Sequence, residues 1–260
     1  MTNAEEQALR ELVAASLDEA ERVWNQARPL MEKSAVRMDS AWDMQTTIPG
    51  YETIIDGKPE VDTFICMAID MRNSSGHLMQ AISAKIAKVS QLERIFYETS
   101  ALLPAAAQII GNHGGRVTEY LGDGALGMFL ARGEGEDRNE IVRTVYRAAS
   151  NCLDCVDEIV NPELDRRYGL PPLRVGIGLA FSRAVITAVG LQGNRLPKVI
   201  GECVYRATKL CKGDNEIVVD GRLNDIWPSS VGGKLQFAPR VFKGSGGIQH
   251  DGFVVKRGVE

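Results

Sequence analysis

The sequence predicts an α/β fold of the α+β type, built on a ferredoxin-like βαββαβ sheet with an N-terminal helical extension. Short apolar runs alternate with segments whose apolar residues recur every three or four positions. A Gly-Asp-Gly turn at 122–124 joins two short apolar runs, which is typical of a β-hairpin. The resulting order of strand, helix, hairpin, helix and strand is that of the split βαβ arrangement.

Composition indicates one medium-sized domain, or one domain with an appendage. The chain has 260 residues, 44% of them hydrophobic, which supports a large core. Its net charge of −4 disfavours general nucleic-acid binding. No apolar stretch approaches the length of a membrane helix, and the acidic start lacks signal-peptide features. Five scattered cysteines suit reduced thiols, so we expect a cytoplasmic protein without membrane attachment.

The N-terminal region is predicted to be a helix over 3–37 followed by a connecting loop over 38–60. Apolar residues in the helix recur at helical spacing: Leu9, Leu12, Val13, Leu17, Ala20, Val23 and Trp24. This helix either caps the domain or packs against a second copy of the chain. We therefore divide the chain into an extension, 1–60, and a main domain, 61–260.

The main domain is predicted from the pattern of apolar runs and stop signals. A strand is expected at about 62–70 and a helix over roughly 78–112, ending at the Gly-Asn-His-Gly-Gly segment 111–115. The remaining expected elements are a hairpin at 116–121 and 125–131, a helix at 137–161 stopping before Pro162, a strand at 173–181 that 185–189 extends or pairs with, a helix at 201–212, and strands at 216–220 and 252–257.

Two aspartates are the strongest candidates for a functional site. Asp70 closes an apolar run, and Asp123 occupies the hairpin turn. The predicted topology places the first strand beside the hairpin, so the two carboxylates would face each other. Such a pair leaves room for water and phosphate oxygens around Mg²⁺. The simpler alternative is a helix cap and an Asp-Gly turn.

The polar turn directly after Asp70 is a candidate phosphate-binding segment. Its backbone N–H groups open into a predicted helix, an arrangement that suits an anion. The alternative is that one of its serines only caps the helix. The residues concerned are Arg72, Asn73, Ser74 and Ser75.

Four segments together resemble class III nucleotide cyclases: 70–75, 119–124, 173–178 and 199–210. The resemblance implies a homodimer with active sites at the interface and a nucleoside triphosphate substrate. It also implies two Mg²⁺ or Mn²⁺ ions per site, held by Asp70, Asp123 and the backbone carbonyl of Met71. The implied reaction is attack of the ribose 3′-oxygen on the α-phosphate, which releases pyrophosphate.

The chain departs from this family at positions that contact ribose and phosphate. Tyr205 stands where the family usually has Asn, and Lys209 stands where it has Arg. Arg206 is a candidate replacement for that Arg. Lys243 matches the first cation of a phosphate-contacting turn, whereas Ser245 replaces the second. The resemblance therefore implies Tyr205, Arg206, Lys209 and Lys243 as the candidate catalytic residues.

Two positions that select the base in this family carry Glu119 and Lys198 here. A carboxylate accepts from a ring N–H and an ammonium donates to a carbonyl oxygen, so the pair favours GTP or UTP over ATP. Tyr120 adds bulk that would fill the space of a purine.

The chain also resembles the stand-alone bacterial uridylate and cytidylate cyclases of Pycsar anti-phage systems, which are short, soluble and divergent at the same positions. We therefore expect UTP to be converted to cyclic UMP, with CTP close behind and a separate effector protein responding. The alternatives are guanylate or adenylate cyclase activity, or an inactive nucleotide-sensing domain.

Overall fold

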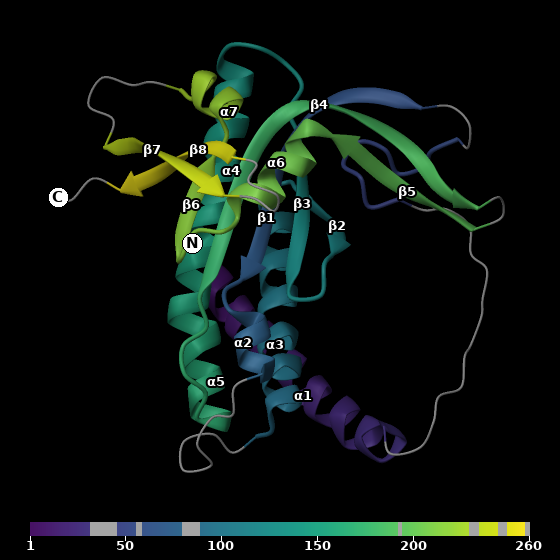
Figure 1. The fold of residues 1–260 in the computed structure, drawn as a ribbon, viewed down its shortest axis with the longest axis vertical. Coiled ribbons are helices and arrows are strands. Elements are labelled where there is room, and N and C mark those ends of the chain that lie inside the picture. The colour runs from purple at the N-terminus through teal and green to yellow at the C-terminus, as the bar shows by residue number, and fades with distance from the viewer. Residues whose placement is uncertain are drawn as a thin grey trace.

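The computed structural model describes residues 1–31, 46–55, 59–79, 89–191, 194–228, 234–243 and 249–257. One eight-stranded sheet with the order β2-β3-β1-β4-β6-β8-β7 forms its centre, and β5 pairs with β4 outside this path (Figure 1). The strands are β1 Glu60–Met71, β2 Arg116–Tyr120, β3 Gly124–Leu130, β4 Val175–Leu191, β5 Asn194–Gly201, β6 Glu216–Val219, β7 Leu235–Lys243 and β8 Gln249–Arg257. The predicted fold class is confirmed.

Strand β1 lies at the centre of the sheet and is buried on both faces. It pairs antiparallel with β3 on one side and with β4 on the other. Alternate residues of a strand face opposite sides. Ile65, Met67 and Ile69 accordingly belong to one core cluster, and Phe64 and Cys66 belong to another. Asp70, two positions after Ala68 in the same alternation, lies on the face of Phe64 and Cys66.

Helices cover the two faces of the sheet unequally. The larger core contains buried residues of α1 Asn3–Met31, α3 Gln91–Asn112, α4 Glu136–Cys155, η1 Val156–Val160 and α5 Asn161–Tyr168. The second core lies under α6 Glu202–Leu210. Two short helices, α2 Ser74–Met79 and α7 Gly221–Asp225, follow β1 and β6. Within the described part of the chain, no helix combines the length and the apolar character that crossing a bilayer requires.

The N-terminal helix packs on the main domain. Leu9, Val13, Leu17 and Ala20 are buried in the same core cluster as α3. The helix expected over 3–37 is observed to Met31, and 32–37 lie outside the described residues. Part of the expected loop, 46–55, buries side chains against the second core and contributes Tyr51, whose hydroxyl donates to Asp62 at 2.8 Å.

The prediction of one helix over 78–112 was wrong. The structure has a six-residue α2 and a separate α3, whereas 80–88 lie outside the described residues. Ser90 begins α3 with a capping box: its side chain accepts from the Glu93 N–H, and the Glu93 carboxylate accepts from the Ser90 N–H. Ser followed three residues later by Glu is a recognised start signal, so the sequence did carry this boundary.

The expected helix stop before Pro162 was also wrong. The helical path continues from α4 through the π-helical η1 into α5 and ends at Gly169, which has a φ of +66°. Pro162 lies in the first turn of α5, where a proline does not break the helix. The π-helical turn separates two α-helical segments, so the proline begins a segment instead of interrupting one.

Three further elements were not predicted, whereas the alternative in which 185–189 extends the strand beginning near 173 is confirmed by β4. β4 reaches Leu191 and turns back into the unpredicted β5 (Figure 1). β5 contains Pro197 and β7 contains Pro239, and proline argues against a strand unless it lies at a sheet edge. Both strands are edge strands in the observed order. The third, α7, begins at Asp220, whose carboxylate accepts from the Leu223 N–H.

Two glycines allow α6 to lie directly on β4. A Cβ added at Gly178 would overlap the Ala207 carbonyl oxygen and lie 2.7 Å from the Cys211 nitrogen. One added at Gly176 would overlap the Cys211 carbonyl oxygen. The two glycines of the Gly-Ile-Gly part of segment 173–178 are therefore explained by packing, since they set the distance between α6 and the sheet.

We expect Gly178→Ala to lower the free energy of unfolding by about 1–3 kcal/mol, because the new methyl group must displace the α6 backbone. Urea unfolding followed by circular dichroism measures this. Gly111→Ala is the matched control: nothing lies within 4 Å of that position in α3. It should leave stability unchanged or raise it by up to about 1 kcal/mol. Equal losses in both variants would contradict the close packing of α6.

Candidate active site

Asp70 and Asp123 lie at the adjoining ends of neighbouring strands. Asp70 pairs in register with Gly124, and the Met71 N–H donates to the Asp123 carbonyl oxygen at 3.3 Å. The hairpin tip is closed by the Leu121 N–H, which donates to the Gly124 carbonyl oxygen at 2.8 Å. The antiparallel register of β1 and β3 thus brings together the two acidic residues that the sequence singles out.

The surroundings of Asp70 accommodate positive charge. Its Oδ2 accepts from Arg72 Nη2, and 36% of its side chain is exposed. A Cβ on Gly124 would lie 3.3 Å from Asp70 Oδ1, so the glycine leaves space beside the carboxylate. Arg72 Nε is buried without a hydrogen-bond partner. The guanidinium is therefore incompletely satisfied in the place where a cation would approach Asp70.

The oxygen groups of this corner suit a hard divalent cation. Asp70, Asp123 and the Met71 carbonyl supply only oxygen, as Mg²⁺ and Mn²⁺ prefer. In the described ranges, no group of three or more His, Cys, Asp or Glu side chains is placed to hold a metal ion. A cation here would consequently depend on backbone and substrate oxygens as well as the two carboxylates.

The turn after Asp70 is tightly fixed to the sheet. The Arg72 N–H donates to the Arg174 carbonyl oxygen at 2.7 Å. Asn73 adopts a left-handed φ of +59°, and a Cβ on Gly76 would overlap its side chain. Ser74 and Ser75 begin α2, which has only six residues. Any phosphate contact would therefore rely on single N–H and hydroxyl groups of the turn, not on a long helix dipole.

Glu119 and Lys198 form an ion pair. Lys198 Nζ lies 2.8 Å from Glu119 Oε2, and both side chains are partly exposed. Glu119 comes from β2 and Lys198 from β5, a strand that the sequence did not predict. Neighbouring Tyr120 has a largely exposed side chain. The two predicted base selectors thus contact each other as a pair of opposite charges.

The residues of α6 divide into two groups. Tyr205 is half exposed, with Lys209 Nζ 5.5 Å from its ring centroid and the His250 ring 5.6 Å away in an edge-on contact. Arg206 instead pairs with Glu202 at 2.7 Å, and this hydrogen bond lowers the pKa of Glu202. The sequence analysis did not select His250, because no local motif marks it and only the sheet brings β8 to α6.

Lys243 lies exposed at the end of β7, and its carbonyl oxygen accepts from Lys212 Nζ at 3.5 Å. Ser245 lies outside the described residues. The structure therefore describes only the first cation of the predicted phosphate-contacting turn.

The five cysteines are free thiols in the core: Cys66, Cys152, Cys155, Cys203 and Cys211. Burial raises the pKa of Cys155 to about 12, and it also raises the pKa of Cys152. A thiol with a raised pKa is a weak nucleophile and a weak metal ligand.

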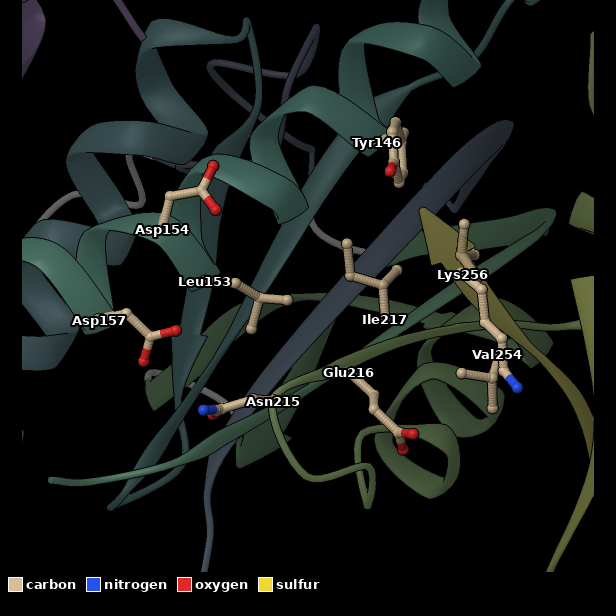
Figure 2. A pocket seen from close by; sticks show the side chains of 10 residues that line it. Tyr146, Leu153, Asp154, Asp157, Asn215, Glu216, Ile217, Val254 and Lys256 are labelled. Atoms are coloured by element: carbon tan, nitrogen blue, oxygen red, sulfur yellow. The ribbon is translucent and has the colours of Figure 1, made fainter. Parts of the chain in front are cut away.

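A pocket of about 310 Å³ lies between α4, η1, β6 and β8 (Figure 2). Its carboxylates come from Asp154, Asp157 and Glu216, and Arg240 lowers the pKa of Glu216 by hydrogen bonding to it. Ile217 on the pocket wall belongs to the core that α4 shares, whereas Asp70 lies on the opposite face of the sheet. The pocket is therefore separate from the two aspartates.

No family model and no curated protein matches the chain. Solved structures do. The guanylyl cyclase Cya2 superposes with a TM-score of 0.61 at 17% identity, covering 79% of this chain and 96% of that one. The adenylyl cyclase CyaB from P. aeruginosa gives a TM-score of 0.58 at 12% identity, covering 78% of this chain and 98% of that one.

A third structure, a class III adenylyl cyclase-like ATP-binding protein from Pseudomonas aeruginosa, gives a TM-score of 0.58 at 14% identity. The match covers 80% of this chain and 44% of the Pseudomonas chain. The chain therefore has the fold of a class III nucleotide cyclase catalytic domain.

We expect Asp70→Asn and Asp123→Asn each to weaken Mn²⁺ binding at least about tenfold, since loss of a metal's supporting groups alone costs 10–100-fold. Titration of free Mn²⁺ by electron paramagnetic resonance measures the affinity. Asp154→Asn is the control, because it removes a carboxylate from the opposite face of the sheet and should change nothing. An equal loss in all three variants would show that the binding is diffuse.

Proposed function

We propose that this chain is a nucleotide cyclase that converts UTP to 3′,5′-cyclic UMP and pyrophosphate. The ion pair of Glu119 and Lys198, at the base-selecting positions of a cyclase fold, is the observation that carries the proposal. The product would act as a second messenger in anti-phage defence, read by a separate effector. That biological role rests on the resemblance to the pyrimidine cyclases of Pycsar systems.

The chemistry of the pair favours uracil and guanine. Both bases present a ring N–H beside a carbonyl oxygen, so Glu119 would accept from the N–H and Lys198 would donate to the oxygen. Cytosine and adenine present an unprotonated ring nitrogen beside an amino group. In the same orientation, the ring nitrogen would place an acceptor against Glu119, and the amino group would place a donor against Lys198. UTP is therefore favoured over CTP as well as over ATP.

The choice between UTP and GTP rests on size. Tyr120 directly follows Glu119 on β2, and we infer that its ring would occupy part of the space that a purine needs. The smaller pyrimidine ring leaves room for it. The Tyr120 side chain is 57% exposed and is therefore accessible to a bound nucleotide.

Catalysis would depend on positioning and charge, without a protein nucleophile. Asp70, Asp123 and the Met71 carbonyl would hold the divalent ions, which would activate the ribose 3′-oxygen and neutralise the triphosphate. The turn from Arg72 to Ser75 would contact phosphate oxygens. On the side of the substrate away from the metal ions, Tyr205 is the candidate to contact the ribose. Lys209 and Lys243 are the candidates to stabilise the charge that develops on the phosphates. Arg206 is a weaker candidate, since Glu202 already engages it.

A second copy of the chain would complete the site. β4 and β5 run out together from the sheet (Figure 1) and expose apolar side chains, among them Leu196 at 60% and Ile200 at 55%. Exposed apolar patches of this kind mark interaction surfaces. We infer that this arm packs on a partner protomer and that each site takes residues from both chains.

One further function has specific support, namely a nucleotide-binding sensor without cyclase activity. Tyr205 and Lys209 replace the residues that usually contact ribose and phosphate, and a Lys lacks the bidentate fork of an Arg. The structural likeness to a cyclase-like ATP-binding protein points the same way. Retention of Asp70 and Asp123 favours the enzyme.

Incubation of the protein with each ribonucleoside triphosphate and Mn²⁺ should give cyclic UMP as the main product, measured by chromatography and pyrophosphate release.

Exchange of the selectors, Glu119→Lys with Lys198→Glu, keeps the ion pair but reverses its direction. We expect it to reduce kcat/KM for UTP about 10–100-fold relative to CTP, because each wrong hydrogen-bonding edge costs about 1–3 kcal/mol. An unaltered preference for UTP over CTP would show that these two residues do not contact the base. Thermal stabilisation by nucleotide without turnover would favour the sensor.

We expect the protein to be a dimer by light scattering, and Leu196→Glu on β5 to give monomers without cyclase activity. The control is Val241→Glu on β7, which is also exposed but lies on a different edge strand. An active Leu196→Glu monomer would show that one chain suffices for catalysis.

A further inference from the structure

A polar triad around a buried carboxylate joins α2 to α3. Glu98 Oε1 lies 2.8 Å from Arg94 Nε, and Glu98 Oε2 lies 2.9 Å from His77 Nδ1. The side chain of Glu98 is 0% exposed, that of Arg94 is 7% exposed and that of His77 is 12% exposed. Arg94 and Glu98 belong to α3, whereas His77 comes from α2.

The triad is satisfied only when His77 is in place. With Glu98 present as a carboxylate, which accepts hydrogen bonds and cannot donate them, this contact needs the His77 tautomer that carries a proton on Nδ1. Arg94 and His77 then take one carboxylate oxygen each. Hydrogen bonds to a charged group are stronger away from water. Loss of the imidazole would leave Glu98 Oε2 buried without this donor.

Helix α2 has little else to hold it on the domain. None of its six residues is buried, and the apolar side chains of Leu78 and Met79 are 43% and 79% exposed. A helix without a buried apolar face gains little from packing. The His77–Glu98 contact is therefore the main polar anchor between α2 and α3 in the described part of the chain.

The anchor lies one helical turn from the candidate phosphate-binding turn. The His77 N–H donates to the Asn73 carbonyl oxygen at 2.9 Å, which closes the first turn of α2. The same turn is held at its other end by the Arg72 N–H on the Arg174 carbonyl oxygen. The segment 72–77 is thus fixed at the sheet by one contact and at α3 by the other.

We propose that His77 is a positioning residue: through Glu98 and Arg94 it holds α2 against α3 and so fixes the turn that binds the substrate phosphates. This inference rests on the proposed function for the role of the turn. The tether itself does not depend on it. His77 contacts neither the candidate metal ligands nor the base selectors, so its effect reaches the substrate only through the backbone of 72–75.

The test compares His77→Ala with His77→Asn. The Asn amide nitrogen can take the place of Nδ1 and donate to Glu98, whereas Ala cannot. We expect His77→Ala to raise KM for UTP about tenfold with kcat changed less than about threefold, since misplaced binding groups weaken ground-state and transition-state binding alike. His77→Asn should restore KM to within about threefold of the parent value. His113→Ala, at the far end of α3, is the control and should leave KM unchanged.

Amide hydrogen exchange without nucleotide or metal tests the tether separately. His77→Ala should speed exchange across 73–79 and leave β1 protected, and His77→Asn should not. Faster exchange in a protein that turns over no nucleotide would support the tether and overturn the cyclase. Unchanged exchange, or unchanged KM in an active enzyme, would overturn the positioning role. Glu98 and Arg94 are poor choices for substitution, because each would leave the other charge buried alone.

Discussion

The antiparallel pairing of β1 with β3 is the constraint on which the rest of the site depends. It sets Asp70 opposite Gly124 and therefore beside Asp123. A shift of one residue would move every side chain of β1 to the other face of the sheet. Both faces of β1 are buried, so the two core clusters fix this register. The hydrophobic core thus determines which two acidic residues adjoin at its edge.

Much of this could be predicted from the sequence because the signals are local. An apolar run ending in Asp70 and a Gly-Asp-Gly turn at Asp123 define a strand and a hairpin, and the order of the elements then makes them neighbours. The start of α3 was equally readable from Ser90 and Glu93, although the sequence analysis passed over it. A proline does not mark a helix end when it falls in the first turn of a new helical segment, as Pro162 does.

The remainder depends on tertiary contacts that leave little trace in a local pattern. Pro197 and Pro239 argue against strands, and only their positions on edge strands make β5 and β7 possible. Without β5, no local pattern indicated that Lys198 pairs with Glu119, and only the family resemblance placed both residues at one base. The contact of His250 with Tyr205 and that of His77 with Glu98 likewise join segments that are distant in the chain. Polar pairs of this kind are visible only once the sheet order is known.

The charged groups of the candidate site are already engaged within the protein. Asp70 accepts from Arg72, Glu119 pairs with Lys198, and Lys209 lies over the ring of Tyr205. A nucleotide would therefore exchange one set of partners for another, and its affinity would be a difference between two sums. A base that satisfies both members of the Glu119–Lys198 pair compensates each charged group for the ion pair that it gives up. A base that satisfies one leaves the other unpaired, which makes the pair more selective than either residue alone.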